Sequence, residues 1–133
     1  MSEDFSPDPH PPAAESGASR SLEISNAISR LHKEFIGRGP TNSRTTIDDN
    51  LIVCVLEGGY TRAERTLNDN DMGDLVAAER LGLQDAIRHA VVAAVEQITG
   101  RRVHSFMSAN DLDRGLQVEV FILAPEQEAA PRT

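Results

Sequence analysis

The sequence is poor in the residues that build cross-linked or membrane-embedded proteins. Cys54 is the only cysteine, so no intramolecular disulfide can form. The longest unbroken apolar run, residues 51–56, is far shorter than the roughly 20 residues that a membrane helix needs. The N-terminus also lacks the basic and then apolar pattern of a secretory signal. These absences favour a cytoplasmic protein without a membrane span.

Positive charge is scarce as well. The chain of 133 residues has 13 basic and 21 acidic side chains, a formal net charge of −8, and Lys33 is its only lysine. A surface that neutralises the phosphates of DNA or RNA needs the opposite balance, so nucleic acid is not an expected partner. The length allows one domain of ordinary size with short tails and excludes a two-domain enzyme.

Composition separates a central domain from two tails. Residues 1–20 hold four of the seven prolines together with acidic and small polar residues. Such a segment cannot bury enough apolar surface to offset its ordering entropy, so we expect it to be disordered. Residues 124–133 have the same bias and should form a second disordered tail. The folded domain is therefore expected over residues 21–123.

Two segments of this domain have helical periodicity. The first carries apolar residues at spacings of four, three and four, with Ser21 as its expected N-cap: Ile24, Ile28, Leu31 and Phe35. It should end at residues 37–40, because Pro40 cannot continue a helix. The second covers residues 71–99, with an apolar side that includes Met72 and Leu75, and Gly100 should close it.

Four segments predict strands. Residues 43–47 and 51–56 flank a polar turn and indicate a hairpin, and residues 103–107 and 116–123 flank a second polar loop. Both faces of 51–56 are apolar, which favours a central strand. In the last strand Leu116, Val118, Val120 and Ile122 share one face. On the other face Gln117 and Glu119 suggest partial solvent exposure, which the apolar Phe121 and Leu123 qualify.

The predicted fold class is α+β, with two layers in the order α-β-β-α-β-β. A four-stranded, mostly antiparallel sheet with both helices on one face follows from the pattern of elements. The other face of the sheet would then expose part of residues 51–56. That uncovered face is the natural surface for a homodimer.

Arginine residues after helices and in loops are the first candidates for a site. Arg38, Arg44, Arg62 and Arg65, with Glu64 among them, form a candidate anion-binding or interaction set. The planar guanidinium binds carboxylate, phosphate or bicarbonate with two hydrogen bonds. The competing interpretation is structural, because cations near helix C-termini complement the macrodipole and pair with acids.

No motif in the chain predicts catalysis, a metal or a cofactor. Thr61 and Glu64 match a capping box at a helix start, and this structural role is sufficient for both residues. The histidines lack the close spacing that preorganises zinc, so we expect no metal site and no cofactor. Cys54 lies in the most apolar strand and should be buried and inert.

Several of these segments together resemble the MpsC family of small bacterial proteins, a domain family named for a sodium-translocating, membrane-potential-generating system. The resemblance covers about residues 22–123, in this order: residues 31–40, Arg44 with Thr45, residues 61–67, residues 99–101 with Val103, Ser105 and Phe106, and the strand 118–123. It implies a cytoplasmic protein that works beside membrane components tied to sodium or inorganic-carbon transport. With no segment able to cross a membrane, the chain is not expected to be the translocating subunit.

Three hypotheses for function follow, in order of preference. The first is a non-catalytic accessory or regulatory domain of such a membrane system, whose partners are membrane transport proteins. The second is a small-anion-binding sensor that uses the arginine set. The third is an enzyme with Glu64 or an aspartate as its base, a hypothesis that no partner residue in the sequence supports.

Overall fold

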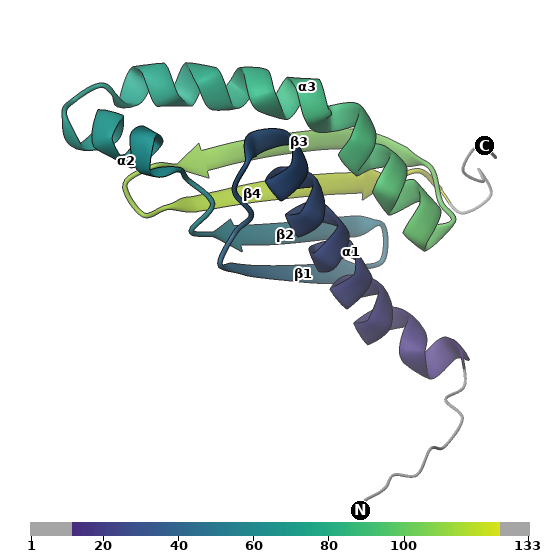
Figure 1. The fold of residues 1–133 in the computed structure, drawn as a ribbon. Coiled ribbons are helices and arrows are strands. Elements are labelled where there is room, and N and C mark those ends of the chain that lie inside the picture. Colours follow the sequence, from purple (N-terminus) through teal and green to yellow (C-terminus); the bar gives the residue numbers. More distant parts are fainter. Residues whose placement is uncertain (1–11, 126–133) are drawn as a thin grey trace, which may run out of the picture.

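The computed structural model describes residues 12–125, which form three helices and one four-stranded sheet (Figure 1). In chain order the elements are α1 (Pro12–Ile36), β1 (Asn42–Asp48), β2 (Leu51–Glu57), α2 (Arg62–Asp69), α3 (Gly73–Thr99), β3 (Val103–Asp111) and β4 (Leu116–Leu123). The predicted α+β class and the two hairpins are confirmed. The short helix α2 is additional to the predicted order.

The sheet is antiparallel throughout, with strand order β1-β2-β4-β3. The two hairpins meet through β2 and β4, so the strand of residues 51–57 is central, as its apolar composition predicts. Helices α1 and α3 lie on one face of the sheet, α1 against β1 and α3 against β3, and they contact each other (Figure 1). The prediction that both long helices share one face is confirmed.

The core lies between these helices and the sheet. Ile24 and Ile28 of α1 and Val91 of α3 are fully buried against Ile52 and Phe121 of the central strands. Burial of such side chains contributes roughly 1.5–3 kcal/mol each. The core therefore fixes the positions of α1 and α3 on the sheet.

The first helix starts earlier than predicted. It begins at Pro12, so Ser21 lies inside the helix and is not its N-cap. Proline suits the first turn of a helix, and the alanines that follow it are strong helix formers, which the disorder signal of this segment concealed. Residues 1–11 of the expected N-terminal tail and 126–133 of the C-terminal tail lie outside the described residues. Ala124, expected to begin the latter tail, is buried and donates its N–H to the Arg102 carbonyl oxygen at 2.8 Å.

The predicted facing of the last strand is wrong. Gln117 and Glu119 are buried beneath the helices together with Phe121 and Leu123. The alternate residues of β4 lie on the uncovered face of the sheet. Residues Phe121 and Leu123 extend the core, and a period of two forces Gln117 and Glu119 onto the same side.

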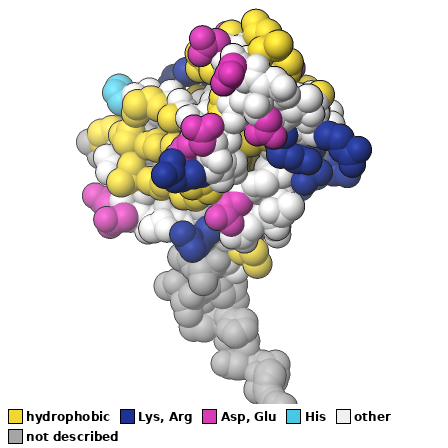
Figure 2. Space-filling model, turned by 90° about the vertical axis from the view of Figure 1, so that its left-hand side faces the viewer, with side chains coloured by type: hydrophobic (Ala, Val, Ile, Leu, Met, Phe, Trp, Pro, Cys, Tyr) yellow, Lys and Arg dark blue, Asp and Glu magenta, His cyan; other side chains and the backbone are white. Residues whose placement is uncertain are grey.

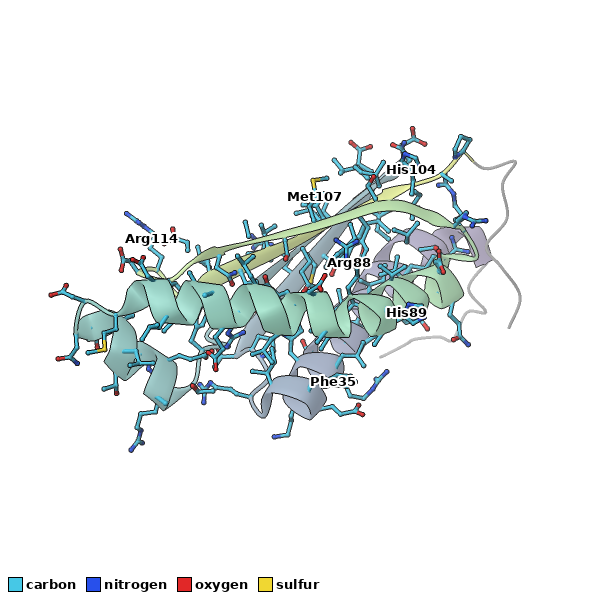
Figure 3. The ribbon with its side chains drawn as sticks, turned by 90° about the horizontal axis from the view of Figure 1, so that it is seen from above. Phe35, Arg88, His89, His104, Met107 and Arg114 are labelled. Atoms are coloured by element: carbon cyan, nitrogen blue, oxygen red, sulfur yellow. The ribbon has the colours of Figure 1, made fainter. Side chains whose placement is uncertain are left out.

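Three aromatic and aliphatic side chains in the predicted helix stripes are also exposed. Phe35, Met72 and Leu75 are among the exposed large apolar residues, and Arg80 and Gln84 are buried on α3 instead. Figure 3 shows Phe35 on the helical side of the molecule, whereas Met107 lies on the opposite side of the sheet and points away from α3.

We use the term open sheet face for the side of the sheet that α1 and α3 leave uncovered. Cross-strand pairing places three apolar pairs on this face: Leu51 with Ile122, Val53 with Val120 and Val55 with Val118. Leu51 is exposed and the other five are half-buried. In Figure 2 hydrophobic side chains gather on the left, the side turned away from α1.

Candidate functional site

The structure separates the five candidate residues into three places. Arg38 and Arg62 line one hollow at the C-terminal end of α1. Arg44 lies on β1 in register with Val55, so it shares the open sheet face. Glu64, which is buried beneath α3, and Arg65 both line a second pocket beside α2. The set predicted from sequence is therefore not one site.

We call the hollow beside Arg38 and Arg62 the basic hollow. It has a volume of about 450 Å³, and its lining residues are Lys33, Gly37, Arg38, Gly39, Thr41, Thr61 and Arg62. The last turn of α1, the loop that follows it and the start of α2 each contribute a side chain. In Figure 2 the largest group of Lys and Arg side chains lies on the right, the side that carries α1 in Figure 1.

Local backbone structure holds these three segments together. Gly37 has φ of +92° and donates its N–H to the Lys33 carbonyl oxygen at 3.0 Å, which ends α1 with a residue that tolerates this conformation. Arg38 then donates from Nε to the Gly58 carbonyl oxygen at 3.0 Å and ties the loop to the end of β2. Thr61 accepts a hydrogen bond from the Glu64 N–H and caps α2 beside the loop.

Only cations contribute charge to the basic hollow. No carboxylate lines it, and within residues 19–125 neither Lys33, Arg38 nor Arg62 belongs to an ion pair. Lys33 stands in the last turn of α1, where it also complements the helix dipole. Three cations around one hollow in a chain of net charge −8 attract carboxylate or phosphate groups.

Glu64 forms a buried ion pair with a residue that the sequence did not single out. Arg80 of α3 donates from Nε to Glu64 Oε2 at 2.8 Å and from Nη2 to Oε1 at 2.6 Å. Arg80 also donates to the Gly59 carbonyl oxygen at 2.8 Å, and its guanidinium lies 4.4 Å from the centre of the Tyr60 ring. The Thr61 N–H completes the capping box by donating to Glu64 at 2.8 Å. The prediction of a capping box at Thr61 is confirmed.

These contacts make Glu64 a poor proton acceptor. Burial by itself raises the pKa of Glu64, but the hydrogen bonds from Arg80 and the Thr61 backbone lower it to about 2. A general base at neutral pH needs a pKa much closer to 7 and a free lone pair directed at substrate. Nearby Glu79, hydrogen-bonded to Glu64, has its pKa raised by that contact. The Glu64–Arg80 pair therefore joins α2 to α3 and offers no base for catalysis.

Polar side chains continue from this pair into the core. Arg80 Nη1 lies 3.5 Å from Gln117 Oε1, and Gln117 donates to Glu119 Oε2 at 3.2 Å. His32 of α1 contacts the same oxygen at 3.1 Å, and Glu119 Oε1 accepts no hydrogen bond from the described residues. This buried polar chain links both long helices to β4, and solvent does not reach it.

The second pocket has a more balanced charge. It encloses about 270 Å³ beside α2, and Tyr60, Glu64, Arg65, Asp113 and Arg114 are among its lining residues. Arg65 donates one N–H to the Tyr60 carbonyl oxygen at 2.8 Å. Burial raises the pKa of Tyr60 to about 12 although Arg80 lowers it, so its hydroxyl stays protonated. Acids and bases alternate here, and the pocket gives no preference for one ligand charge.

Within the described part of the chain, no three His, Cys, Asp or Glu residues lie close enough together to hold a metal ion. Cys54 is fully buried, as predicted, and burial raises the pKa of its thiol to about 11 despite a hydrogen bond with Thr45. A thiol with this pKa is almost entirely protonated near neutral pH and is a weak nucleophile.

Sequence reasoning missed four members of the buried network: His32, Arg80, Gln117 and Glu119. A signal for Arg80 existed, because it falls at a spacing of four from Val76 and Gln84, which are both buried. Gln117 and Glu119 alternate with Phe121 and Leu123, so assigning those apolar residues to the core would have placed the polar pair there too.

The model of the MpsC family, described as a Na⁺-translocating membrane potential-generating system, matches residues 18–125. The chain therefore belongs to the MpsC family, and the resemblance noted in the sequence is confirmed.

Two relatives come from Bacillus subtilis (strain 168). One is the uncharacterized protein YbcI, 30% identical over 111 residues that cover 71% of this chain and 90% of the relative. The other is the uncharacterized protein YrhF, 26% identical over 102 residues that cover 75% of this chain and 84% of the relative. No solved structure matches the chain. Among the described residues, no helix combines the length and apolarity required to cross a bilayer.

Proposed function

We propose that this protein is a non-catalytic accessory or regulatory domain of a membrane-potential-generating system, and that it acts in the cytoplasm. The observation that carries the proposal is the basic hollow. Its three cations lie on the surface with no carboxylate beside them, whereas Glu64, the one carboxylate singled out as a base, is held by Arg80. The chemistry of the hollow is recognition of an anion. Family membership supplies the kind of system to which that anion belongs.

The anionic group has two sources that share one chemistry. A carboxylate from an acidic segment of a membrane partner fits the accessory role, and the hollow would then be a docking point. A small free anion fits a sensor, the second candidate function. The same side chains, Arg38 and Arg62, serve both, because a guanidinium binds either group with two hydrogen bonds.

Native co-purification tests the accessory role. The tagged full chain is isolated from gently solubilised membranes of the organism that encodes it, beside an Arg38→Ala/Arg62→Ala double variant. A double variant of two exposed arginines elsewhere, Arg30→Ala/Arg102→Ala, changes the net charge by the same amount. The proposal predicts that wild type and this control retain a subunit of a sodium-translocating system and that the hollow variant loses it. Equal retention by all three chains, or no such subunit with any of them, would refute it.

A thermal-shift titration with inorganic phosphate and with bicarbonate distinguishes the sensor. A ligand at 100 times its dissociation constant stabilises the folded state by roughly 2.7 kcal/mol, which is easily measured. Stabilisation by one of these anions that the Arg38→Ala/Arg62→Ala variant abolishes would favour the sensor. No stabilisation by millimolar phosphate or bicarbonate would exclude these two anions and leave the partner carboxylate as the occupant.

A further inference from the structure

The two central strands of the open sheet face have the composition of a buried surface, whereas the edge strand β1 presents polar side chains there. An antiparallel sheet with one solvated face usually alternates apolar residues toward the core with polar residues toward water. Here both central strands carry only apolar side chains along three consecutive cross-strand pairs of the uncovered face, from Leu51–Ile122 to Val55–Val118. Met107 of β3 is 53% exposed beside Val120 and extends the apolar area to a third strand. A contiguous patch of this kind on a folded protein marks an interaction surface.

We propose that a second copy of this chain covers the open sheet face, and that the two sheets pack face to face as a two-fold symmetric dimer. This proposal does not depend on the basic hollow, which lies on the helical side of the molecule. In the dimer each sheet has α1 and α3 on its outer side and the second copy on its inner side. The dimer would then have four layers, in the order helices, sheet, sheet, helices.

The arrangement of residues on the face is self-complementary about an axis parallel to the strands. Such an axis places β2 over β4 of the second copy, because these are the two central strands. Leu51 then lies over Ile122, Val53 over Val120 and Val55 over Val118 of that copy, so apolar rows meet apolar rows. A perpendicular in-plane axis through the middle of β2, at Cys54, would instead place Leu51 over Glu57 of the second copy. The axis parallel to the strands is therefore favoured.

The same axis also brings opposite charges together at the edges of the face. It places β1 over β3 of the second copy, so Arg44 lies over Ala109 and one register row from Asp111 of that copy. Arg44 and Asp111 are both exposed at the same end of the sheet, and symmetry forms the contact twice. Opposite charges at the rim fix the register of an interface more than they increase its affinity.

The area of the face suits a second sheet. Strands about 4.8 Å apart with a rise of about 3.3 Å per residue give four strands a flat footprint of about 500 Å² per copy. Two copies together bury about twice this flat area, and the side chains that project from the sheet add to it. The total buried area therefore reaches the roughly 1,000 Å² expected of a biological interface. A single helix, 10–12 Å across, would cover only about half of the width. An anionic lipid surface is disfavoured, because Asp48, Glu57 and Asp111 border the face.

Light scattering after size-exclusion chromatography, with sedimentation equilibrium on the full chain, tests the dimer. The expected mass at micromolar concentration is twice 14.5 kDa. Val120→Lys and Met107→Lys place an ammonium in the apolar interface and should raise the dimer dissociation constant about tenfold or more. Leu81→Lys, at a position 60% exposed on α3, is the matched control and should leave the constant within about twofold.

A rim variant keeps the test valid if a lysine in the sheet prevents folding. Arg44→Glu changes an exposed side chain and sets one acid beside Asp111 of the other copy at each of the two symmetric contacts. It should therefore weaken the dimer about threefold or more, and increasingly so at low salt. Arg102→Glu makes the same charge change away from the face and should not. A wild-type chain that is monomeric at 100 µM, or a dimer that is unaffected by the folded face variants, would overturn the proposal.

Discussion

At the residue scale, the chain uses its buried charges for structure and keeps its free cations at the surface. Glu64 and Arg80 satisfy each other inside the molecule, with further hydrogen bonds to Thr61 and Gly59. A buried pair of this kind need not stabilise a fold more than apolar residues would, but removing one partner leaves an uncompensated charge. The pair therefore makes the junction of α2 and α3 sensitive to single substitutions.

Arg80→Ala should destabilise the protein by about 3–5 kcal/mol, because the Glu64 carboxylate would stay buried without its partner. Urea unfolding followed by circular dichroism measures the loss. Arg88→Ala is the matched control, since Arg88 on the same helix makes an exposed ion pair with Asp85 at 4.0 Å. Its effect should stay below about 1 kcal/mol. Equal effects of the two variants would show that the buried pair is not important for stability.

The same pair predicts how stability depends on pH. The folded-state pKa of Glu64, about 2, lies below its ordinary value of 4.5. The pair's contribution is therefore fully present above about pH 4.5 and is lost as the pH falls toward 2. Urea midpoints measured between these values should fall less steeply in Glu64→Gln than in the wild type. Parallel curves would mean that Glu64 does not titrate in this range.

Cys54 should be unreactive in the folded protein. Its thiol is fully buried, and burial raises its pKa to about 11. A thiol reagent such as iodoacetamide at pH 8 should label the unfolded chain completely and the native chain only as fast as it unfolds. Rapid labelling under native conditions would show that β2 opens locally far more often than a central strand should.

At the element scale, the hydrophobic periods predicted the number and type of the long elements, and polar residues caused the errors. Ile24 and Ile28 identify the buried side of α1, and residues 51–57 form the expected central strand. Both faces of β4 are apolar in part, so its pattern alone does not determine which face the helices cover. The buried face is the one that carries Gln117 and Glu119, because Arg80 and His32 provide hydrogen-bond partners for these two side chains. Local spacing can place Arg80 on the buried side of α3, but it cannot pair Arg80 or His32 with a strand that is distant in sequence.

The candidate site was also predicted only in part from the sequence. Sequence reasoning identified Arg38 and Arg62 as a possible anion site, and the structure brings them together with Lys33. It could not separate them from Arg44 and Arg65, because grouping residues from several loops and strands requires the topology. Glu64 could be recognised as a capping residue from Thr61 alone, since a capping box is a local motif.

Helix α2 should depend on its capping box. Thr61→Ala removes the side-chain acceptor of the Glu64 N–H and should cost about 1 kcal/mol, with faster hydrogen exchange in α2. Thr66→Ala removes a hydroxyl that bonds the Arg62 carbonyl oxygen within the same helix, and its cost should be smaller. Exchange measured by mass spectrometry would separate the two. Identical exchange in both variants would argue that the α3 contacts, not the cap, hold α2.

At the scale of the whole molecule, the two faces have different chemistry. The helical side carries the basic hollow, and the opposite side carries the apolar open sheet face (Figure 2). In the proposed function, the basic hollow is the place at which this acidic chain, of net charge −8, recognises an anionic partner. A dimer through the open sheet face would leave both hollows accessible, because they lie on the outer sides of the assembly.

Site-specific photo-crosslinking in living cells tests whether the basic hollow contacts a membrane partner. A photoreactive residue replaces Thr41, which is exposed and lines the basic hollow, or Leu81, which is exposed on α3. We expect position 41 to crosslink to a subunit of a sodium-translocating membrane system and position 81 not to do so. Crosslinking of that subunit from position 81 alone, or from neither position in cells that contain it, would refute docking through the basic hollow.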